Sequence, residues 1–116
     1  LIKSDAGRAI LLSSGVAHSC RPFWSAYSAS KAAVEALGRT WAAETQKTAL
    51  RVNCVNPGAT RTAMRAQAVP GEDPSTLPTP SDVAKTLLPL LAPEQTETGK
   101  LFSVRDNKFL DYHLPE

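Results

Sequence analysis

The sequence predicts an α/β fold in which a mainly parallel sheet is covered by helices on both faces. Short apolar segments typical of buried strands alternate with helical segments along the chain, in the order strand, helix, strand, helix, strand. A helix between two strands of one sheet forces parallel pairing with a right-handed crossover. At 116 residues the chain has room for one domain and not for two.

The first half of the chain predicts two strands with a helix between them. Residues 1–7 are typical of the last turn of a helix ended by a glycine, and residues 8–14 form an apolar run typical of a strand buried on both faces. Residues 25–45 are rich in alanine and predict a helix with Ser25 as its N-cap. Residues 50–56 have high β-propensity and predict the second strand.

The second half predicts a loop, a helix and a third strand. Four prolines lie within residues 64–80 and exclude a continuous helix there. Thr79 is the predicted cap of a helix over residues 80–91, which begins with a proline. Residues 99–105 predict the third strand, and the polar tail 106–116 predicts irregular structure.

Composition and charge exclude several classes of function. Thirteen basic and eleven acidic residues leave a net charge of +2, too balanced for a nucleic-acid-binding or membrane-surface protein. No apolar run approaches the roughly 18 residues of a membrane span, so we expect a cytoplasmic protein. The two histidines and two cysteines lack metal-site spacing, so no metal is expected, and Cys54 is expected to be a buried free thiol.

Tyr27 and Lys31 form a pair with a chemical use. They lie four residues apart in the predicted helix, so their side chains share one face. A free phenol has a pKa of about 10 and is a poor acid or base at neutral pH, but a nearby ammonium group favours its ionised form. Ser14 ends the first strand and residues 57–62 follow the second, and the carboxyl ends of parallel strands open onto one crevice. We therefore expect these three stretches to meet at one site.

Alternatives remain open for some of these residues. Ser13 is chemically equivalent to Ser14, and only the separation of thirteen residues from Tyr27 favours Ser14. Arg61 and Arg65 are expected to be solvated side chains, and the alternative is that they contact a phosphate or an acidic substrate.

Three stretches resemble the short-chain dehydrogenase/reductase family: LLSSGVA, YSASKAAVEAL and RVNCVNPGATRT, at residues 11–17, 27–37 and 51–62. Their order and spacing match the family's C-terminal half. The resemblance implies a Rossmann-type doubly wound parallel sheet, with residues 1–116 forming one partial domain of three strands and their helices. It also implies NAD or NADP as cofactor, a small alcohol or carbonyl compound as substrate, and a homo-oligomer, either dimer or tetramer.

The resemblance also implies a role for each matched residue. Tyr27 would exchange a proton with the carbinol oxygen, and Lys31 would lower the pKa of that tyrosine and bind the nicotinamide ribose. Ser14 would hydrogen-bond the substrate oxygen and stabilise the charge that develops there. The residues after the second strand would contact the nicotinamide: Pro57, Gly58 and Thr60 beside the ring, and Thr62 at its carboxamide or a phosphate.

The sequence departs from the family in lacking the glycine-rich TGxxxGxG turn that binds the cofactor's pyrophosphate, and in lacking the asparagine upstream of the serine strand. Three interpretations therefore stay open. The first is an NAD(P)-dependent oxidoreductase that interconverts an alcohol and a carbonyl by hydride transfer. The second is a non-catalytic fragment that cannot bind the dinucleotide. The third is an isomerase or dehydratase of the family's extended branch, which the short stretch after Thr62 disfavours.

Overall fold

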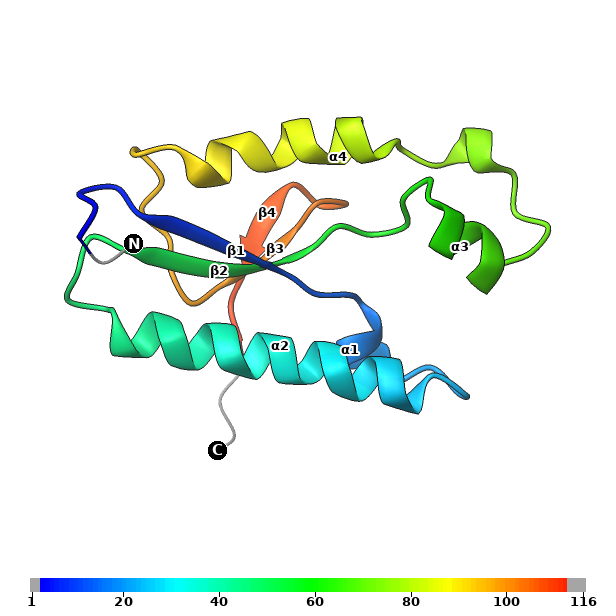
Figure 1. Cartoon of the computed structure of the whole chain (residues 1–116), viewed down its shortest axis with the longest axis horizontal. Helices are drawn as coiled ribbons and strands as arrows, with labels where there is room; N and C mark the ends of the chain where they lie inside the picture. The colour runs from blue at the N-terminus through cyan, green and yellow to red at the C-terminus, as the bar shows by residue number, and fades with distance from the viewer. Residues whose placement is uncertain (1–2, 113–116) are drawn as a thin grey trace.

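Residues 3–112, which the computed structural model describes, form a four-stranded sheet between two layers of helix (Figure 1). The strands lie in the order β1 (Arg8–Leu12), β2 (Arg51–Asn56), β3 (Leu101–Ser103) and β4 (Lys108–Leu110). The first three are parallel, and β4 pairs antiparallel with β3. The predicted α/β fold with a mainly parallel sheet is confirmed.

Helices cover both faces of the sheet. Helix α2 (Ser25–Glu44) packs on one face, and α4 (Pro80–Leu87) lies on the other, continued by the 3-10 helix η2 (Leu88–Leu91) (Figure 1). The connections contain three shorter helices: α1 (Val16–Ser19), α3 (Ala63–Ala68) and the 3-10 helix η1 (Pro74–Thr76). Both strand-to-strand crossovers therefore run through helices, as parallel pairing requires.

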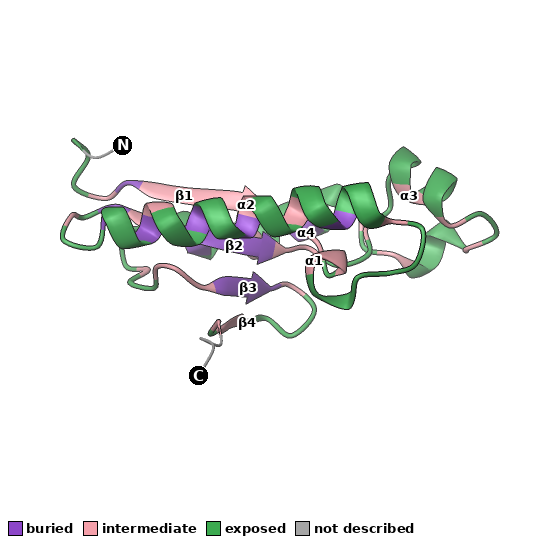
Figure 2. Ribbon diagram, turned by 90° about the horizontal axis from the view of Figure 1, so that it is seen from below, coloured by how far each residue is buried: buried purple, intermediate pink, exposed green. Residues whose placement is uncertain are grey.

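The core divides into two apolar clusters, one on each face of β2. The cluster beneath α2 contains Ala42, Leu50 and Val52, and the cluster beneath η2 contains Val55, Leu90 and Phe102. Val52 and Val55 are completely buried on opposite faces of the same strand. Figure 2 shows the buried residues concentrated on β2, β3 and the inner side of α2. A fully buried valine stabilises the fold by about 1.5–3 kcal/mol, so β2 contributes to both layers at once.

The sheet has one more strand than the sequence predicts. The tail was expected to be irregular from residue 106, but Lys108–Leu110 form β4 in a tight hairpin with β3. Asn107 takes a left-handed backbone conformation (φ 51°) in the turn, which asparagine tolerates well. Phe109 packs edge-on against Phe102 with ring centroids 5.1 Å apart, so a single aromatic contact stabilises a strand too short to read from its pattern. Residues 113–116 of the tail lie outside the described residues.

Helix α2 begins at Ser25, as predicted, but the predicted N-cap is wrong by one residue. Trp24 is the N-cap, its side chain makes no capping hydrogen bond, and Ser25 is the first helical residue. The four-residue helix α1 has no predicted counterpart. Residues 3–6 form a turn where the end of a helix was expected, and residues 1–2 of that prediction lie outside the described part of the chain.

The segment between β2 and α4 contains more helix than expected. Within the predicted loop 64–80, helix α3 forms ahead of the first proline and is capped by Thr62. The prediction that Thr79 caps the next helix is confirmed: its hydroxyl accepts from the amide of Asp82, and the Asp82 carboxylate accepts from the amide of Thr79, both at 3.2 Å. That helix becomes 3-10 at Leu88 because Pro89 has no N–H to donate to an α-helical bond.

Three further features concern membrane spans, metal sites and cysteines. Within residues 3–112, no helix is both long and apolar enough to cross a membrane. In the same part of the chain, no three His, Cys, Asp or Glu side chains gather as a metal site requires. Cys54 is a buried free thiol, as predicted, and Cys20 is exposed.

Gly38 allows α2 to approach β2 closely. A Cβ atom at this position would lie 2.6 Å from the Sγ of Cys54. Glycine to alanine normally stabilises a helix by about 0.5–1 kcal/mol, but overpacking costs about 1–3 kcal/mol, so we expect Gly38→Ala to lower the free energy of unfolding of the protein. Chemical denaturation measures the change.

The same substitution in a Cys54→Ala background provides the control. There the new methyl group occupies space left by the thiol, so Gly38→Ala is expected to be neutral or stabilising. A destabilisation of equal size in both backgrounds would show that the contact with Cys54 is not its cause.

Candidate active site

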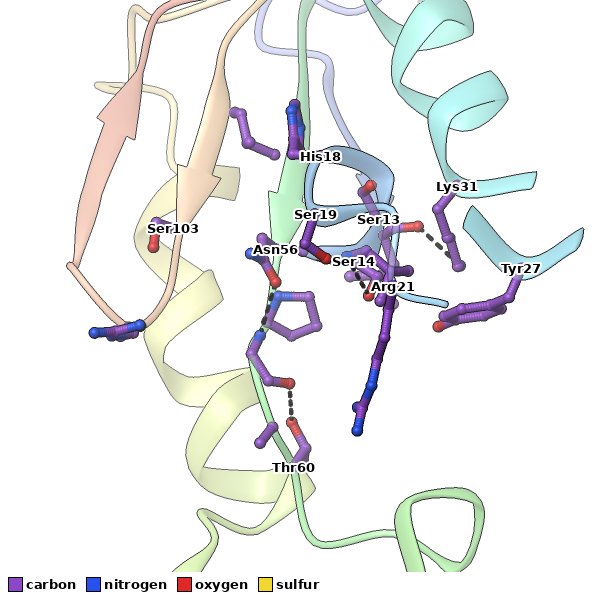
Figure 3. A pocket seen from close by; sticks show the side chains of 18 of the residues that line it. Ser13, Ser14, His18, Ser19, Arg21, Tyr27, Lys31, Asn56, Thr60 and Ser103 are labelled. Carbon is purple, nitrogen blue, oxygen red and sulfur yellow. Dashed lines mark hydrogen bonds between the residues drawn. The ribbon is translucent and has the colours of Figure 1, made fainter. Parts of the chain in front are cut away.

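An open cleft of about 2330 Å³ lies at the carboxyl ends of β1 and β2. All the sequence-predicted site residues line it: Ser14, Tyr27, Lys31, Pro57, Gly58, Thr60 and Thr62. They come from three separate segments: the loop after β1, the first turns of α2 and the loop after β2 (Figure 3). The parallel pairing of β1 with β2 brings these segments together, because it places both strand ends at the same edge of the sheet.

The alternation of side chains in β1 and beyond distinguishes the two serines. Ser13 is 4% exposed and donates its hydroxyl hydrogen to the Glu35 carboxylate on α2. Ser14 is half-buried at the cleft, and its Oγ accepts a long bond from the amide of Val16 at 3.4 Å. The Ser14 hydroxyl therefore keeps its hydrogen free to donate, whereas that of Ser13 is already used.

Tyr27 and Lys31 lie on the cleft side of α2, one turn apart. Tyr27 is 36% exposed, and its ring extends toward the end of β1 and not into the interior (Figure 3). The Lys31 ammonium lies 5.7 Å from the centroid of this ring and donates to the carbonyl of Leu12 at 3.2 Å. An ammonium has three N–H donors, so Lys31 has two more to offer in the cleft.

The loop after β2 is shaped by bonds from side chains to the backbone. The Asn56 side-chain oxygen accepts from the amide of Gly58 at 3.0 Å, and the Thr60 hydroxyl donates to the carbonyl of Gly58 at 3.2 Å (Figure 3). Gly58 is left-handed (φ 72°), and a Cβ there would meet no atom within 4 Å. The loop therefore borders open space. Sequence reasoning did not select Asn56, although an asparagine just before Pro-Gly is a common turn signal.

Thr62, Arg61 and Arg65 organise the segment beyond this loop. Thr62 accepts from the amide of Arg65 at 3.0 Å and retains its own hydroxyl hydrogen. Arg65 forms a two-bond ion pair with Glu72 at 2.8 and 3.0 Å, which holds the pKa of the Glu72 carboxyl below its ordinary value. Arg61 donates to the carbonyls of Pro74 and Leu77 at 2.8 and 3.4 Å. Arg61 is exposed, as expected, although it also bonds the main chain, whereas the Arg65 side chain is only 30% exposed and is paired with Glu72.

The sequence analysis did not identify Glu35, whose carboxylate bonds three other side chains. It is 4% exposed, and its carboxylate bonds Ser13, His18 Nε2 at 2.8 Å and the Tyr112 hydroxyl at 2.8 Å. The guanidinium of Arg39 lies 4.3 Å from the centroid of the Tyr112 ring. The available signal was an acidic residue four positions after Lys31, on the same helical face.

Tyr112 gives a pH-dependent test of this cluster. Burial, and then the hydrogen bond to Glu35, raise the pKa of the Tyr112 phenol well above its ordinary value. In the unfolded chain this phenol loses its proton above about pH 10, while in the folded protein it stays protonated, so the free energy of unfolding must fall as pH rises past that point. We expect Tyr112→Phe to show a shallower fall. Denaturation curves recorded at several alkaline pH values measure the difference, and identical slopes for both proteins would contradict it.

The sequence of this chain is similar to those of known oxidoreductases. A family model described as short chain dehydrogenase matches residues 1–73. The chain is 46% identical over 109 residues to the uncharacterized oxidoreductase YciK of Escherichia coli (strain K12), a match that covers 93% of this chain and 43% of YciK.

Two solved structures of short chain dehydrogenases have a similar fold. A short chain dehydrogenase from Salmonella enterica subsp. enterica serovar Typhi str. CT18 matches with a TM-score of 0.85 at 45% identity, covering 90% of this chain and 44% of that one. One from Escherichia coli CFT073, complexed with NADPH, has a TM-score of 0.84 at 47% identity, with coverage of 90% and 44%. The chain thus spans less than half the length of the relatives it matches. The family model, the relatives and the shared fold all lead to the same conclusion: this chain belongs to the short-chain dehydrogenase family.

Proposed function

We propose that the protein is an NADP(H)-dependent oxidoreductase that interconverts an alcohol and a carbonyl compound, and that residues 1–116 are the C-terminal part of its Rossmann-type catalytic domain. The observation that carries this proposal is the convergence of Ser14, Tyr27 and Lys31 on one cleft, opposite the loop that contains Gly58. A hydroxyl donor, a phenol and an ammonium group around one space are what proton exchange with an alcohol oxygen requires.

The residues present fit the nicotinamide end of the cofactor. Lys31 has two N–H donors available for ribose hydroxyls, and Thr62 has a free hydroxyl hydrogen for the carboxamide or a phosphate. Pro57, Gly58 and Thr60 border open space in which a flat ring can lie. When bound, the cofactor supplies or accepts the hydride. NADPH is the form to test first, because the neighbour from Escherichia coli CFT073 is complexed with it.

The chain's own side chains would manage the proton and the developing charge. Tyr27 donates its phenolic proton to the carbonyl oxygen during reduction and takes it back during oxidation. Lys31 stabilises the phenolate that is left behind, since its ammonium lies beside the ring. Ser14 donates a hydrogen bond to the substrate oxygen and stabilises the negative charge that forms there.

Subunit contacts are also part of the proposal. The outer face of α2 exposes the small side chains of Ala29, Ala33 and Ala36 beside Leu37, which is 63% exposed. We propose that a second copy packs on this face, because small residues allow two helices to approach closely. Sedimentation of the full-length protein is expected to give a dimer or a tetramer, and replacement of Leu37 by glutamate is expected to weaken it; a monomer at micromolar concentration would contradict the proposal.

Tyr27→Phe tests the catalytic assignment. The variant keeps the aromatic ring, including its edge contact with Trp24 at 6.0 Å between centroids, so folding should be unaffected. We expect turnover of a panel of small aldehydes and ketones by the full-length protein to fall by about 10²- to 10⁴-fold. Oxidation of NADPH, followed by its absorbance, measures the rate, and NADPH fluorescence titration checks that binding is retained. Near-normal turnover in the variant would refute the role of Tyr27.

The 116-residue chain itself serves as the comparison protein. It contains no glycine-rich phosphate-binding turn, so we expect it to bind NADPH far more weakly than the full-length protein does. Equal affinity would show that the nicotinamide end alone accounts for cofactor binding.

A further inference from the structure

Glu35 is a buried acid that lies behind the cleft and does not line it. Only 4% of the residue is exposed, yet three of its partners, Ser13, His18 and Tyr112, do line the cleft. A buried carboxylate is stable only when donors surround it, and here three groups from three separate segments bond its two oxygens. Removing the carboxylate would release all three segments at once.

The bond from Ser13 to Glu35 is one of two that attach the end of β1 to α2. The carbonyl of Leu12 accepts from Lys31, and the hydroxyl of the next residue, Ser13, donates to Glu35. Lys31 and Glu35 lie one turn apart on the helix, so two consecutive residues at the end of β1 are bonded to two successive turns of α2. Ser14 follows Ser13 directly, and the position of its side chain relative to α2 depends on this attachment.

The other Glu35 oxygen, Oε1, connects two walls of the cleft. His18 Nε2 and the Tyr112 hydroxyl both lie 2.8 Å from it. His18 belongs to α1, which follows Ser14 closely, and Tyr112 belongs to the segment after β4, which passes to the α2 side of the sheet (Figure 1). Arg39, one turn after Glu35, lies over the Tyr112 ring and completes the enclosure.

We propose that Glu35 is a positioning residue for the oxidoreductase site: through Ser13 it sets the position of Ser14 relative to Tyr27 and Lys31, and through His18 and Tyr112 it holds the adjoining walls of the cleft. The proposal rests on the proposed function. Glu35 does not itself line the cleft, so it would act only through neighbouring side chains that do.

Glu35→Gln tests the proposal in the full-length protein. Glutamine keeps one acceptor oxygen and replaces the other by an NH₂ donor, so the hydroxyl of Ser13 or that of Tyr112 can no longer donate to this side chain, and the charge that strengthens the bonds is removed. We expect kcat for the best substrate of the aldehyde and ketone panel to fall about 10- to 100-fold, since small misplacements of catalytic groups have effects of this size. The dissociation constant for NADPH, measured by fluorescence, is expected to stay within about twofold because Lys31 is untouched. Glu44→Gln, an exposed change of the same kind in the same helix, is the control and should leave both values unchanged.

A double-mutant cycle separates positioning from general destabilisation. If Glu35 acts through Ser14, Glu35→Gln should cause little further loss of kcat once Ser14 has been replaced by alanine. Equal fold-losses in the wild-type and Ser14→Ala backgrounds would overturn the proposal. If Glu35→Gln does not fold, Ser13→Ala replaces it in the same cycle, because it removes the same bond and leaves the carboxylate its other two donors.

Amide exchange provides a readout that does not need turnover. The amide of Ser13 donates to the carbonyl of Val55 at 2.7 Å, and we expect its hydrogen exchange to speed up in Glu35→Gln and not in Glu44→Gln. A wild-type exchange rate at Ser13 in Glu35→Gln would overturn the proposal even if no substrate is turned over. Different results would refute the proposed function itself: activity retained by Tyr27→Phe, or no oxidation of NADPH by the wild-type protein.

Discussion

The parallel pairing of β1 with β2 is the constraint on which the site depends. Five residue pairs in register, from Arg8 with Arg51 to Leu12 with Val55, place the carboxyl ends of both strands at one edge of the sheet. The chain must then cross back between them, and α2 makes that crossing against the buried face of β2. Its first turns consequently begin beside the strand ends. A phenol and an amine in those turns meet the loops after both strands without any further adjustment of the backbone.

The close packing of α2 against the sheet keeps this arrangement rigid. Gly38 and Cys54 bring the helix near β2, while Lys31 and Glu35 hold the end of β1. Apolar contacts and polar bonds therefore share the same helix face, with the apolar contacts toward its C-terminal end and the polar ones toward the cleft. These contacts attach α2 to the sheet at several points, and the role proposed for Tyr27 depends on such preorganisation.

Much of the fold and of the candidate site could be predicted from the sequence, because local patterns carry the information. The apolar strands, the alanine-rich helix and the Thr79 cap all depend on neighbouring residues, and the structure agrees with each. The convergence of Ser14, Tyr27 and Lys31 also follows, since strand order and crossover chirality leave few other arrangements. What escaped prediction depends on partners distant in the chain. Glu35 reads as an ordinary helical residue until Tyr112, 77 positions later, is brought beside it.

The two serines illustrate the same limit on a smaller scale. Spacing alone separated Ser13 from Ser14, whereas the alternation of strand side chains shows which hydroxyl is already bonded to α2. Strand β4 was missed for a related reason, because three residues are too few to show a period and its stability comes from the contact between Phe109 and Phe102. Short elements held by tertiary contacts carry little local signal.

The anchoring of the segment after β2 has an evolutionary consequence. Arg61 holds this segment through the main-chain oxygens of Pro74 and Leu77 and not through their side chains. Every amino acid offers a carbonyl, so the residues that Arg61 tethers can be exchanged during divergence while the tether itself persists. A tether of this kind lets a lineage change the side chains at Pro74 and Leu77 without rebuilding the framework beneath them.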